Sequence, residues 1–281
     1  MTYPITALSS RTDTLNICQI SDLHLTGKIG HAPSYQQFLT VLKLATYHHP
    51  APDLLLLTGD LVNDGNRDAY DWLFDTLDRT DIPYLAIAGN HDVTHEIGTS
   101  LPYPQRLHIP INPDARLLDR HAVMLNFADT AWQLLLINSA VNGETHGALP
   151  KPTLDWLDQQ LTQNPAPAII AMHHHPLPVR SAWIDAYVLD NQDDFWQIIK
   201  KHPHAHTVLC GHVHQVHTIH PLADHPVQLL TCLSTDRQFA PFCDEFRLDD
   251  APAGCRMIHI SNNHTLSSYI IFMQNTPPFA E

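Results

Sequence analysis

Five short polar clusters in this chain combine carboxylate, amide and imidazole side chains, and each cluster follows a run of apolar residues. They are Ser21-Asp22-Leu23-His24, Thr58-Gly59-Asp60, Gly89-Asn90-His91-Asp92, Met172-His173-His174-His175-Pro176 and Gly211-His212-Val213-His214. Residues i and i+2 of an extended segment share a face, so the aspartate and histidine of the first cluster could reach one cation, as could the two histidines of the last. Oxygen and nitrogen donors without sulfur favour iron, manganese, cobalt or zinc over calcium or magnesium.

Each cluster alone also has a purely structural explanation. An isolated Asp-x-His is often a capping aspartate beside a surface histidine, and Gly89-Asn90 is a strong turn dipeptide. The shared position of the clusters favours the functional interpretation. The apolar runs that precede them lie at 15–20, 54–57, 84–88, 168–172 and 207–210. Because the carboxyl ends of parallel strands collect side chains at one edge of a sheet, we expect the five clusters to meet there.

The elements that must position these clusters alternate between strands and helices. Helix-like stretches at 35–47, 67–79, 153–161 and 191–200 lie between the apolar runs. This alternation indicates βαβ units and an α/β fold. We expect one domain, residues 1–281, because a hydrophobic content of 44% can supply one large core. The segment from about 215 to 275 is different, because its apolar runs are typical of strands joined by turns, which indicates an antiparallel layer.

Asp60 is the residue around which a cation site would be organised. The four leucines at 54–57 predict a strand that is buried on both faces, and the Thr58-Gly59 step allows a tight turn after it. The two oxygens of a carboxylate could bridge two cations. The candidate ligands are Asp22, His24, Asp60, Asn90, one of His173 to His175, His212 and His214. Donors of this kind around a bridging carboxylate suit the two-metal arrangement used in phosphoryl chemistry.

The overall charge limits the partners of such a site. Fifteen basic against twenty-nine acidic residues give a net charge of −14, which argues against a nucleic-acid or anionic-membrane surface. A small anion remains compatible, because divalent cations would reverse the sign of the local field. The five scattered cysteines contain no C-x-x-C pair, and no apolar run is long enough to cross a bilayer. We therefore expect a cytoplasmic protein in a reducing compartment.

The order of these motifs resembles that of the calcineurin-like metallophosphoesterase superfamily. Further motifs resemble the bacterial class III 3′,5′-cyclic AMP phosphodiesterases, namely 173–178, Trp183-Ile184-Asp185, Leu233-Ser234-Thr235, Gln238-Phe239 and Pro241. The likeness runs from about Ile17 to nearly the end of the chain. It implies a four-layer αββα sandwich with a dinuclear metal site at the carboxyl ends of the strands. In this fold the segment 215–275 would supply strands of the second sheet and part of the substrate pocket.

The resemblance also implies roles for individual residues. One cation would be held by Asp22, His24, Asp60 and His214, and the other by Asp60, Asn90, His173 and His212. His91 would act near the leaving oxygen, in catalysis with Asp60. The substrate would lie against His24, Asp60, Asn90 and His91. Many members have an aspartate three residues after the bridging one, which is thought to orient the catalytic histidine, whereas this chain has Asn63 there and Asp64 beside it. Related enzymes are often homodimers.

The function that we expect is hydrolysis of 3′,5′-cyclic AMP to 5′-AMP with two divalent cations, iron or manganese before zinc or cobalt. The partner is then a small cyclic nucleotide, and neither nucleic acid nor membrane. A phosphodiesterase of broader specificity, acting on glycerophosphodiesters or 2′,3′-cyclic nucleotides, would use the same cations and His91. A non-catalytic scaffold would usually have lost ligands, and every ligand type is present in this chain.

Overall fold

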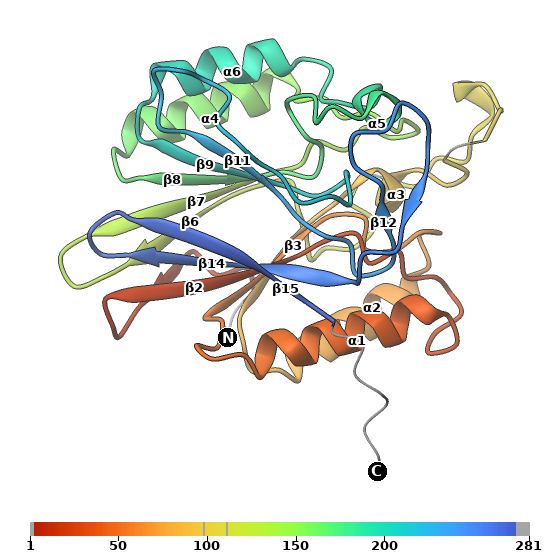
Figure 1. Ribbon diagram of the computed structural model, residues 1–281, viewed down its shortest axis with the longest axis horizontal. Coiled ribbons are helices and arrows are strands. Elements are labelled where there is room, and N and C mark those ends of the chain that lie inside the picture. The colour runs from red at the N-terminus through yellow and green to blue at the C-terminus, as the bar shows by residue number, and fades with distance from the viewer. Residues whose placement is uncertain (1–2, 98, 111, 274–281) are drawn as a thin grey trace.

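Two β-sheets packed face to face form the centre of the protein, in a computed structural model that describes residues 3–97, 99–110 and 112–273 (Figure 1). The seven-stranded sheet has the spatial order β1 (Ala7–Ser9), β6 (Arg120–Asn126), β7 (Ala131–Ile137), β8 (Ala168–Ala171), β9 (Ala205–Cys210), β11 (Gln228–Thr231) and β10 (Thr218–Ile219). The six-stranded sheet has the order β15 (Leu266–Phe272), β14 (Gly254–Ser261), β2 (Thr14–Ile20), β3 (Leu54–Thr58), β4 (Tyr84–Ile87) and β5 (Leu117–Leu118). A separate antiparallel pair consists of β12 (Gln238–Phe239) and β13 (Leu248–Asp249).

Both sheets are parallel where the polar clusters emerge. Strands β2 to β5 run parallel in one sheet, and β7, β8, β9 and β11 run parallel in the other. Strand β14 pairs antiparallel with β2, and β6 pairs antiparallel with β7. The five polar clusters therefore begin at the carboxyl ends of β2, β3, β4, β8 and β9.

Helices cover the outer face of each sheet (Figure 1). Those outside the six-stranded sheet are α1 (Pro33–Thr46) and α2 (Arg67–Asp78), and those outside the seven-stranded sheet are α4 (Lys151–Gln163) and α6 (Gln192–Lys201). The connections contain the short helices α3 (Asn90–Val93) and α5 (Ala182–Asp185) and the 3₁₀ turn η1 (Tyr103–Gln105). This order of layers confirms the αββα sandwich expected from the sequence. Within the described ranges, no helix combines the length and the apolar character that a membrane span requires.

The four leucines of β3 show how one strand joins the layers. Leu54 and Leu56 belong to the core between the two sheets, whereas Leu55 and Leu57 belong to the core beneath α1 and α2. All four are fully buried. Burial of one leucine side chain contributes about 1.5–3 kcal/mol, so β3 is anchored on both of its faces.

The local sequence also fixes where α2 begins. The side chain of Asn66 accepts a hydrogen bond from the backbone nitrogen of Ala69 at 3.1 Å and so caps the helix. Tyr70, Leu73 and Leu77 then form its buried face at the spacing of a helix. The helix ends at Asp78, one residue before the predicted end.

The C-terminal segment supplies strands to both sheets, so the expectation of a single antiparallel layer is wrong for its first part. Strands β14 and β15 pair antiparallel, as expected. Strand β11 instead lies parallel to β9 and extends the seven-stranded sheet. Strand β11 can run parallel to β9 because the chain reverses direction after the short strand β10, which pairs antiparallel with β11.

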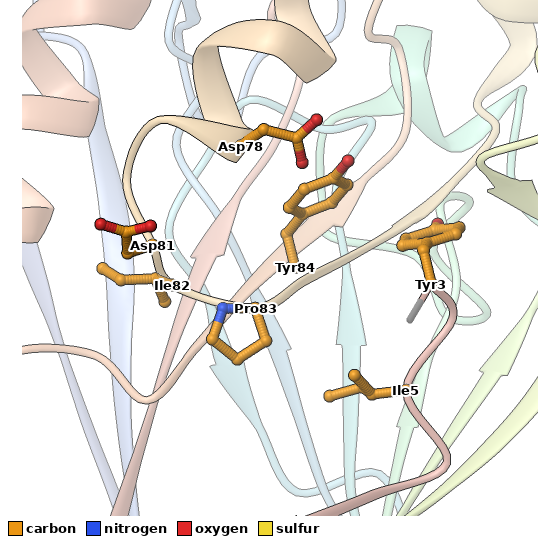
Figure 2. A pocket seen from close by; sticks show the side chains of 7 residues that line it. All are labelled: Tyr3, Ile5, Asp78, Asp81, Ile82, Pro83 and Tyr84. Atoms are coloured by element: carbon orange, nitrogen blue, oxygen red, sulfur yellow. The ribbon is translucent and has the colours of Figure 1, made fainter. Parts of the chain in front are cut away.

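A surface hollow of about 240 Å³ lies at the other end of β4 from the polar clusters (Figure 2). Tyr84 begins β4 and Asp78 ends α2, and the ring of Tyr3 lies 5.4 Å from that of Tyr84. Figure 2 shows the ring of Tyr84 between the Asp78 carboxylate and the ring of Tyr3. The length of β4 therefore separates this hollow from the residues that could do chemistry.

Candidate metal centre and active site

The chain turns sharply at the ends of the site-forming strands. Five polar residues there have positive φ: Asp22 (55°), His24 (48°), Asp60 (53°), His212 (66°) and His214 (48°). The extended geometry expected for the two i, i+2 pairs is therefore wrong, because each pair lies in a turn and not in a continued strand. Such backbone conformations cost on the order of 1–3 kcal/mol each in a residue other than glycine. Backbone hydrogen bonds hold the turns, for example from the nitrogen of Asp22 to the oxygen of Gly59 at 3.0 Å.

Gly59 and Gly89 allow two of these turns to approach each other. A Cβ atom at Gly59, where φ is +93°, would lie 2.5 Å from Nδ1 of His173. A Cβ atom at Gly89 would lie 2.2 Å from Oδ1 of Asp60. Both distances are too short for non-bonded atoms, so any side chain at either position would displace a candidate ligand.

Asp22, His24 and His214 form the first group of potential ligands. Nε2 of His214 lies 3.2 Å from Oδ1 of Asp22 and 3.2 Å from Nε2 of His24, and the ligand atoms of the three residues lie within 4.8 Å of one another. Oδ2 of Asp60 completes the group at 3.9 Å from Nε2 of His24. Burial disfavours the charged form of Asp22, but His214 and His173 outweigh this effect and lower its pKa.

Asp60, Asn90 and His173 form the second group, and His212 lies beside them. Nε2 of His173 is 3.0 Å from Oδ1 of Asn90 and 3.4 Å from Oδ1 of Asp60. The ring centroids of His173 and His212 are 5.1 Å apart. Burial opposes a charge on His173, but Asp60 outweighs it and raises the pKa of His173 to about 9. The carboxylate of Asp60 thus directs one oxygen at each group.

The hydrogen bonds of His24 and His214 leave lone pairs directed into the first group. Nδ1 of His24, His173 and His214 each faces a carbonyl oxygen. These oxygens belong to the Asn63 side chain (2.8 Å), the Thr58 backbone (2.8 Å) and the Arg237 backbone (2.7 Å). A carbonyl oxygen only accepts, so these partners assign a hydrogen to each Nδ1 and, in the neutral rings of His24 and His214, a lone pair to Nε2. Nε2 of His173 also faces an acceptor, the side-chain oxygen of Asn90 at 3.0 Å.

A cation in the first group would satisfy these lone pairs, and one in the second would give Nε2 of His212 a partner. Nε2 of His24 and Nε2 of His214 face each other at 3.2 Å, although neither carries the hydrogen in the neutral ring. Nε2 of His212 is buried and has no hydrogen-bond partner within the described residues. Buried polar atoms without a partner are costly, and metal-binding histidines commonly donate their other nitrogen to a carbonyl group. The residues present therefore fit a centre of two divalent cations.

Asn63 does not orient His91, although the family pattern suggests that role for its position. Its side-chain oxygen accepts the hydrogen bond from His24, a candidate ligand. Asp64 accepts hydrogen bonds from the backbone nitrogens of Gly27 (2.9 Å) and Asn66 (3.2 Å) and so holds its own loop. In the described part of the chain, the His91 ring makes no hydrogen bond with either residue.

His91 is instead positioned through its backbone. Its nitrogen donates to Oδ1 of Asp60 at 2.8 Å, and Nε2 of its ring lies 4.0 Å from Oδ2 of the same carboxylate. The side chain is 26% exposed. Burial of the ring lowers the pKa of His91 to about 4, and the nearby Asp60 only partly opposes this effect. The ring packs edge-on against His24, with centroids 4.8 Å apart, and its exposed part is available to a substrate.

The three consecutive histidines have different surroundings. Nδ1 of His174 lies 2.8 Å from Oγ of Ser139, and its Nε2 lies 3.1 Å from the backbone oxygen of Thr145, so both nitrogens of His174 are engaged. His175 stacks on His212 with ring centroids 5.6 Å apart. Of the three, His173 directs a ring nitrogen at Asp60.

Alanine variants of this triplet should therefore differ in metal content. His173→Ala is expected to lose one of two cations, because it removes the nitrogen that faces Asp60 and Asn90. His174→Ala is expected to keep both. Elemental analysis of the purified variants measures this, and His175→Ala is the matched control for loss of a buried imidazole. Metal loss in His174→Ala with retention in His173→Ala would show that the ligand is the second histidine.

Asp92 and Tyr70 link the loop that carries Asp60 to the loop that carries Asn90. The carboxylate of Asp92 accepts from the backbone nitrogens of Gly89 (2.8 Å), Leu61 (3.1 Å) and Val62 (3.0 Å) and from the hydroxyl of Tyr70 (2.6 Å). Burial raises the pKa of Asp92 to about 6 against the effect of these donors. The sequence does not assign a role to either residue. Asp92 closes the cluster Gly89-Asn90-His91-Asp92, whereas Tyr70 matches the buried face of a predicted helix.

Tyr70→Phe should weaken both the fold and the metal centre. A hydrogen bond to a charged group contributes about 1.5–3 kcal/mol to stability, so thermal unfolding should shift by a comparable free energy. Residues that orient ligands typically change metal affinity about 10–100-fold, and we expect the lower end of this range. Tyr84→Phe removes a tyrosine hydroxyl far from the site and is the control. A loss of stability with unchanged metal affinity would mean that the hydrogen bond from Tyr70 to Asp92 stabilises the fold but does not orient the ligands.

A cavity of about 450 Å³ opens over the two ligand groups. The residues of the groups that line it, together with His91, are His24, Asp60, Asn90, His212 and His214. Its remaining lining is mainly apolar and aromatic: Ile97, Thr145, Trp183, Ile184, Tyr187, Phe239 and Phe246. The aromatic rings come from distant positions in the chain, so no local pattern could have predicted that they meet.

A four-layer αββα sandwich whose strand ends hold two groups of carboxylate and imidazole ligands defines a dinuclear metallophosphoesterase. The sequence profile of the calcineurin-like phosphoesterase family matches residues 15–216, and the chain belongs to this family. The resemblance noted from the motifs is thereby confirmed. The protein is a metal-dependent phosphoesterase.

Individual proteins show the same relationship. A probable cyclic nucleotide phosphodiesterase of Moraxella catarrhalis (strain BBH18) is 61% identical over 267 residues, which cover 95% of each chain. The 3′,5′-cyclic adenosine monophosphate phosphodiesterase CpdA of Escherichia coli (strain K12) is 30% identical over 267 residues, which cover 93% of this chain and 91% of that protein. A solved dimetal phosphatase of Danio rerio aligns with a TM-score of 0.58 at 15% identity, covering 92% of this chain and 98% of the other.

Proposed function

We propose that this protein hydrolyses 3′,5′-cyclic AMP to 5′-AMP with two divalent cations. The observation that carries the proposal is the cavity, because it joins both ligand groups to an apolar, aromatic region. A cyclic nucleotide has a phosphodiester at one end and a flat base at the other, and it matches both parts. The names of the matched relatives support the same class of substrate.

The ligand groups suggest how the cations would be held. Asp22, His24 and His214 would hold one, Asn90, His173 and His212 the other, and Asp60 would bridge them. Bound there, two cations supply activation of the attacking water and stabilise charge on the phosphate oxygens. The donor set is nitrogen and oxygen without sulfur, which favours iron or manganese, with zinc or cobalt as alternatives.

His91 would protonate the departing 3′ oxygen. Its ring lies at the wall of the cavity, and the hydrogen bond from its backbone to Asp60 keeps it beside the bridging carboxylate. An alkoxide is a poor leaving group, so a proton delivered to it lowers the barrier. Because burial holds the pKa of His91 near 4, this role requires the ring to gain its proton together with the anionic substrate.

The charge and the cysteines support the expected partner and compartment. A net charge of −14 is unfavourable for a polyanion, whereas a small nucleotide would meet only the local field of the cations. All five cysteines are unpaired, and four of them are buried. This use of cysteine favours a reducing cytoplasm.

A panel of substrates tests the proposed activity. The purified protein, reconstituted with iron or manganese, would be given cyclic AMP, cyclic GMP, 2′,3′-cyclic AMP, a glycerophosphodiester and bis(4-nitrophenyl) phosphate. We expect the highest kcat/KM for a 3′,5′-cyclic nucleotide. A preference for the glycerophosphodiester or the 2′,3′-cyclic nucleotide would replace this proposal with the broader phosphodiesterase.

A further inference from the structure

Three aromatic rings form a box at the apolar end of the cavity. Trp183 lies in α5, Phe239 in β12 and Phe246 in the loop before β13. The ring centroids are 4.9 Å apart for Trp183 and Phe239, 5.0 Å for Trp183 and Phe246, and 5.5 Å for Phe239 and Phe246. These three residues are called the aromatic box below. The three rings pack edge to face on one another, and all three residues line the cavity.

The box is joined directly to the metal centre. Phe239 stacks on His214 with centroids 4.0 Å apart and planes 8° apart. Phe246 is different, because it is 58% exposed and its described ring contacts are with Trp183 and Phe239 alone. Substitution of Phe246 therefore changes the box without touching a candidate ligand.

The polar groups near the box are not available to read the edge of a base. Gln238 exchanges hydrogen bonds with the backbone of Ser234 through both its oxygen (3.0 Å) and its nitrogen (2.8 Å). The nitrogen of Gln215 donates to the oxygen of Ala240 at 3.3 Å, and its oxygen pairs with His217 at 2.8 Å. The carboxylate of Asp185 accepts from two backbone nitrogens. Nε1 of Trp183 is buried and so offers no donor at the cavity surface.

The carboxylate and amide groups that do line the cavity belong to its metal end. They are Asp60 and Asn90. Among the described residues that line the apolar end, the side-chain oxygens at the cavity are the hydroxyls of Thr145 and Tyr187. A base in the aromatic box would therefore be held by stacking and other apolar contacts. Few of its hydrogen bonds would depend on which base it is.

We propose that the aromatic box holds the base of a 3′,5′-cyclic nucleotide by stacking, so that the site accepts cyclic GMP nearly as well as cyclic AMP. This inference rests on the proposed function. A site that hydrogen-bonds its substrate rejects an analogue by roughly 10⁴–10⁵-fold, because buried polar groups are left unpaired. The amide and carboxylate groups near the box are already paired within the described residues, and the buried Nε1 of Trp183 does not reach the cavity surface, so a change of base leaves none of them newly unpaired.

Kinetics of the reconstituted enzyme test the role of the box. Stacking on an aromatic side chain typically contributes 1–3 kcal/mol, which corresponds to about 5–150-fold in affinity. We expect Phe246→Ala to raise KM for cyclic AMP and cyclic GMP by an amount in this range, with kcat nearly unchanged because the ring is remote from the reacting atoms. Phe246→Tyr should retain the wild-type KM, and Phe246→Leu should not.

A substrate without a base isolates the stacking contribution. Ribose 3′,5′-cyclic phosphate lacking the base should be hydrolysed with a KM that Phe246→Ala leaves unchanged. Phe272→Ala, which removes an exposed phenylalanine of β15, is the matched control. Calorimetric titration with AMP and GMP provides a readout other than activity, and both should bind more weakly to Phe246→Ala.

The outcomes separate this inference from the proposed function. If cyclic AMP is hydrolysed at least about 100-fold more efficiently than cyclic GMP, or if Phe246→Ala raises KM equally for the base-free substrate, the inference is overturned and the activity stands. If bis(4-nitrophenyl) phosphate is hydrolysed but no 3′,5′-cyclic nucleotide is, the proposed function fails and the inference fails with it.

Discussion

Replacement of Asp60 by alanine is expected to remove both cations and nearly all hydrolysis together. The carboxylate is 2% exposed, and its two oxygens face different groups, with Oδ1 toward His173 at 3.4 Å and Oδ2 toward His24 at 3.9 Å. Asp22 also lies near His173, but Asp60 is the carboxylate whose two oxygens each face a histidine of a different group. Loss of one preorganised hydrogen-bond donor from an active site typically lowers kcat by ~10²–10³-fold, and loss of both cations should exceed this.

The measurement is metal content together with turnover, for the wild type and two variants. Asp60→Asn keeps the shape of the side chain and tolerates the positive φ of this position, so it separates loss of charge from loss of fold. Asp75→Asn, at an exposed position of α2, is the matched control. Two equivalents of metal and unchanged turnover in Asp60→Ala would contradict a bridged two-cation centre.

His91→Ala should keep both cations but slow the hydrolysis of a cyclic nucleotide. On the proposed ligand sets Asn90 supplies a ligand oxygen, whereas the His91 ring is 26% exposed and lines the cavity. General acid catalysis typically contributes 10²–10⁴-fold, and we expect a loss of about this size for the 3′ alkoxide leaving group. The loss should be much smaller for bis(4-nitrophenyl) phosphate, because a nitrophenolate departs without a proton.

The contrast between the two substrates is what decides the role of His91. Metal analysis of the variant is the control, because the backbone nitrogen of His91 also donates to Asp60 and must stay in place. Equal losses on both substrates would mean that His91 stabilises charge on the phosphate instead of delivering a proton. Its assignment as the acid would then be withdrawn.

The strands and the meeting of the polar clusters could be predicted from patterns in the sequence, whereas the four layers were implied by the family resemblance. The leucines of β3 predict burial on both faces, and Leu54 to Leu57 do alternate between two cores. The left-handed turns at Asp22 and His214 could not be predicted, because aspartate and histidine adopt that conformation more often than most residues but still in only a small minority of positions. The i, i+2 spacing therefore predicts correctly which side chains lie together, although it assumes an extended backbone where the structure has turns.

Other parts of the site depend on contacts between distant segments. Tyr70 reaches Asp92 only because α2 packs against the sheet, and the sequence of α2 shows a buried position without its partner. The aromatic box joins residue 183 to residues 239 and 246 through the packing of α5 against the loop between β12 and β13. No periodicity links these positions, so only the folded chain brings them together.

The candidate ligands come from both sheets, and this division affects how an active molecule can arise during synthesis. Asp22, Asp60 and Asn90 follow strands of the six-stranded sheet, whereas His173 and His214 follow strands of the seven-stranded sheet. On the proposed ligand sets, a nascent chain on the ribosome lacks a complete shell for either cation until β9 has paired with β8. Prematurely terminated products would be inactive. A chain cut between α3 and β5 would likewise leave two fragments that each lack ligands, so any activity recovered on mixing them would measure their reassociation.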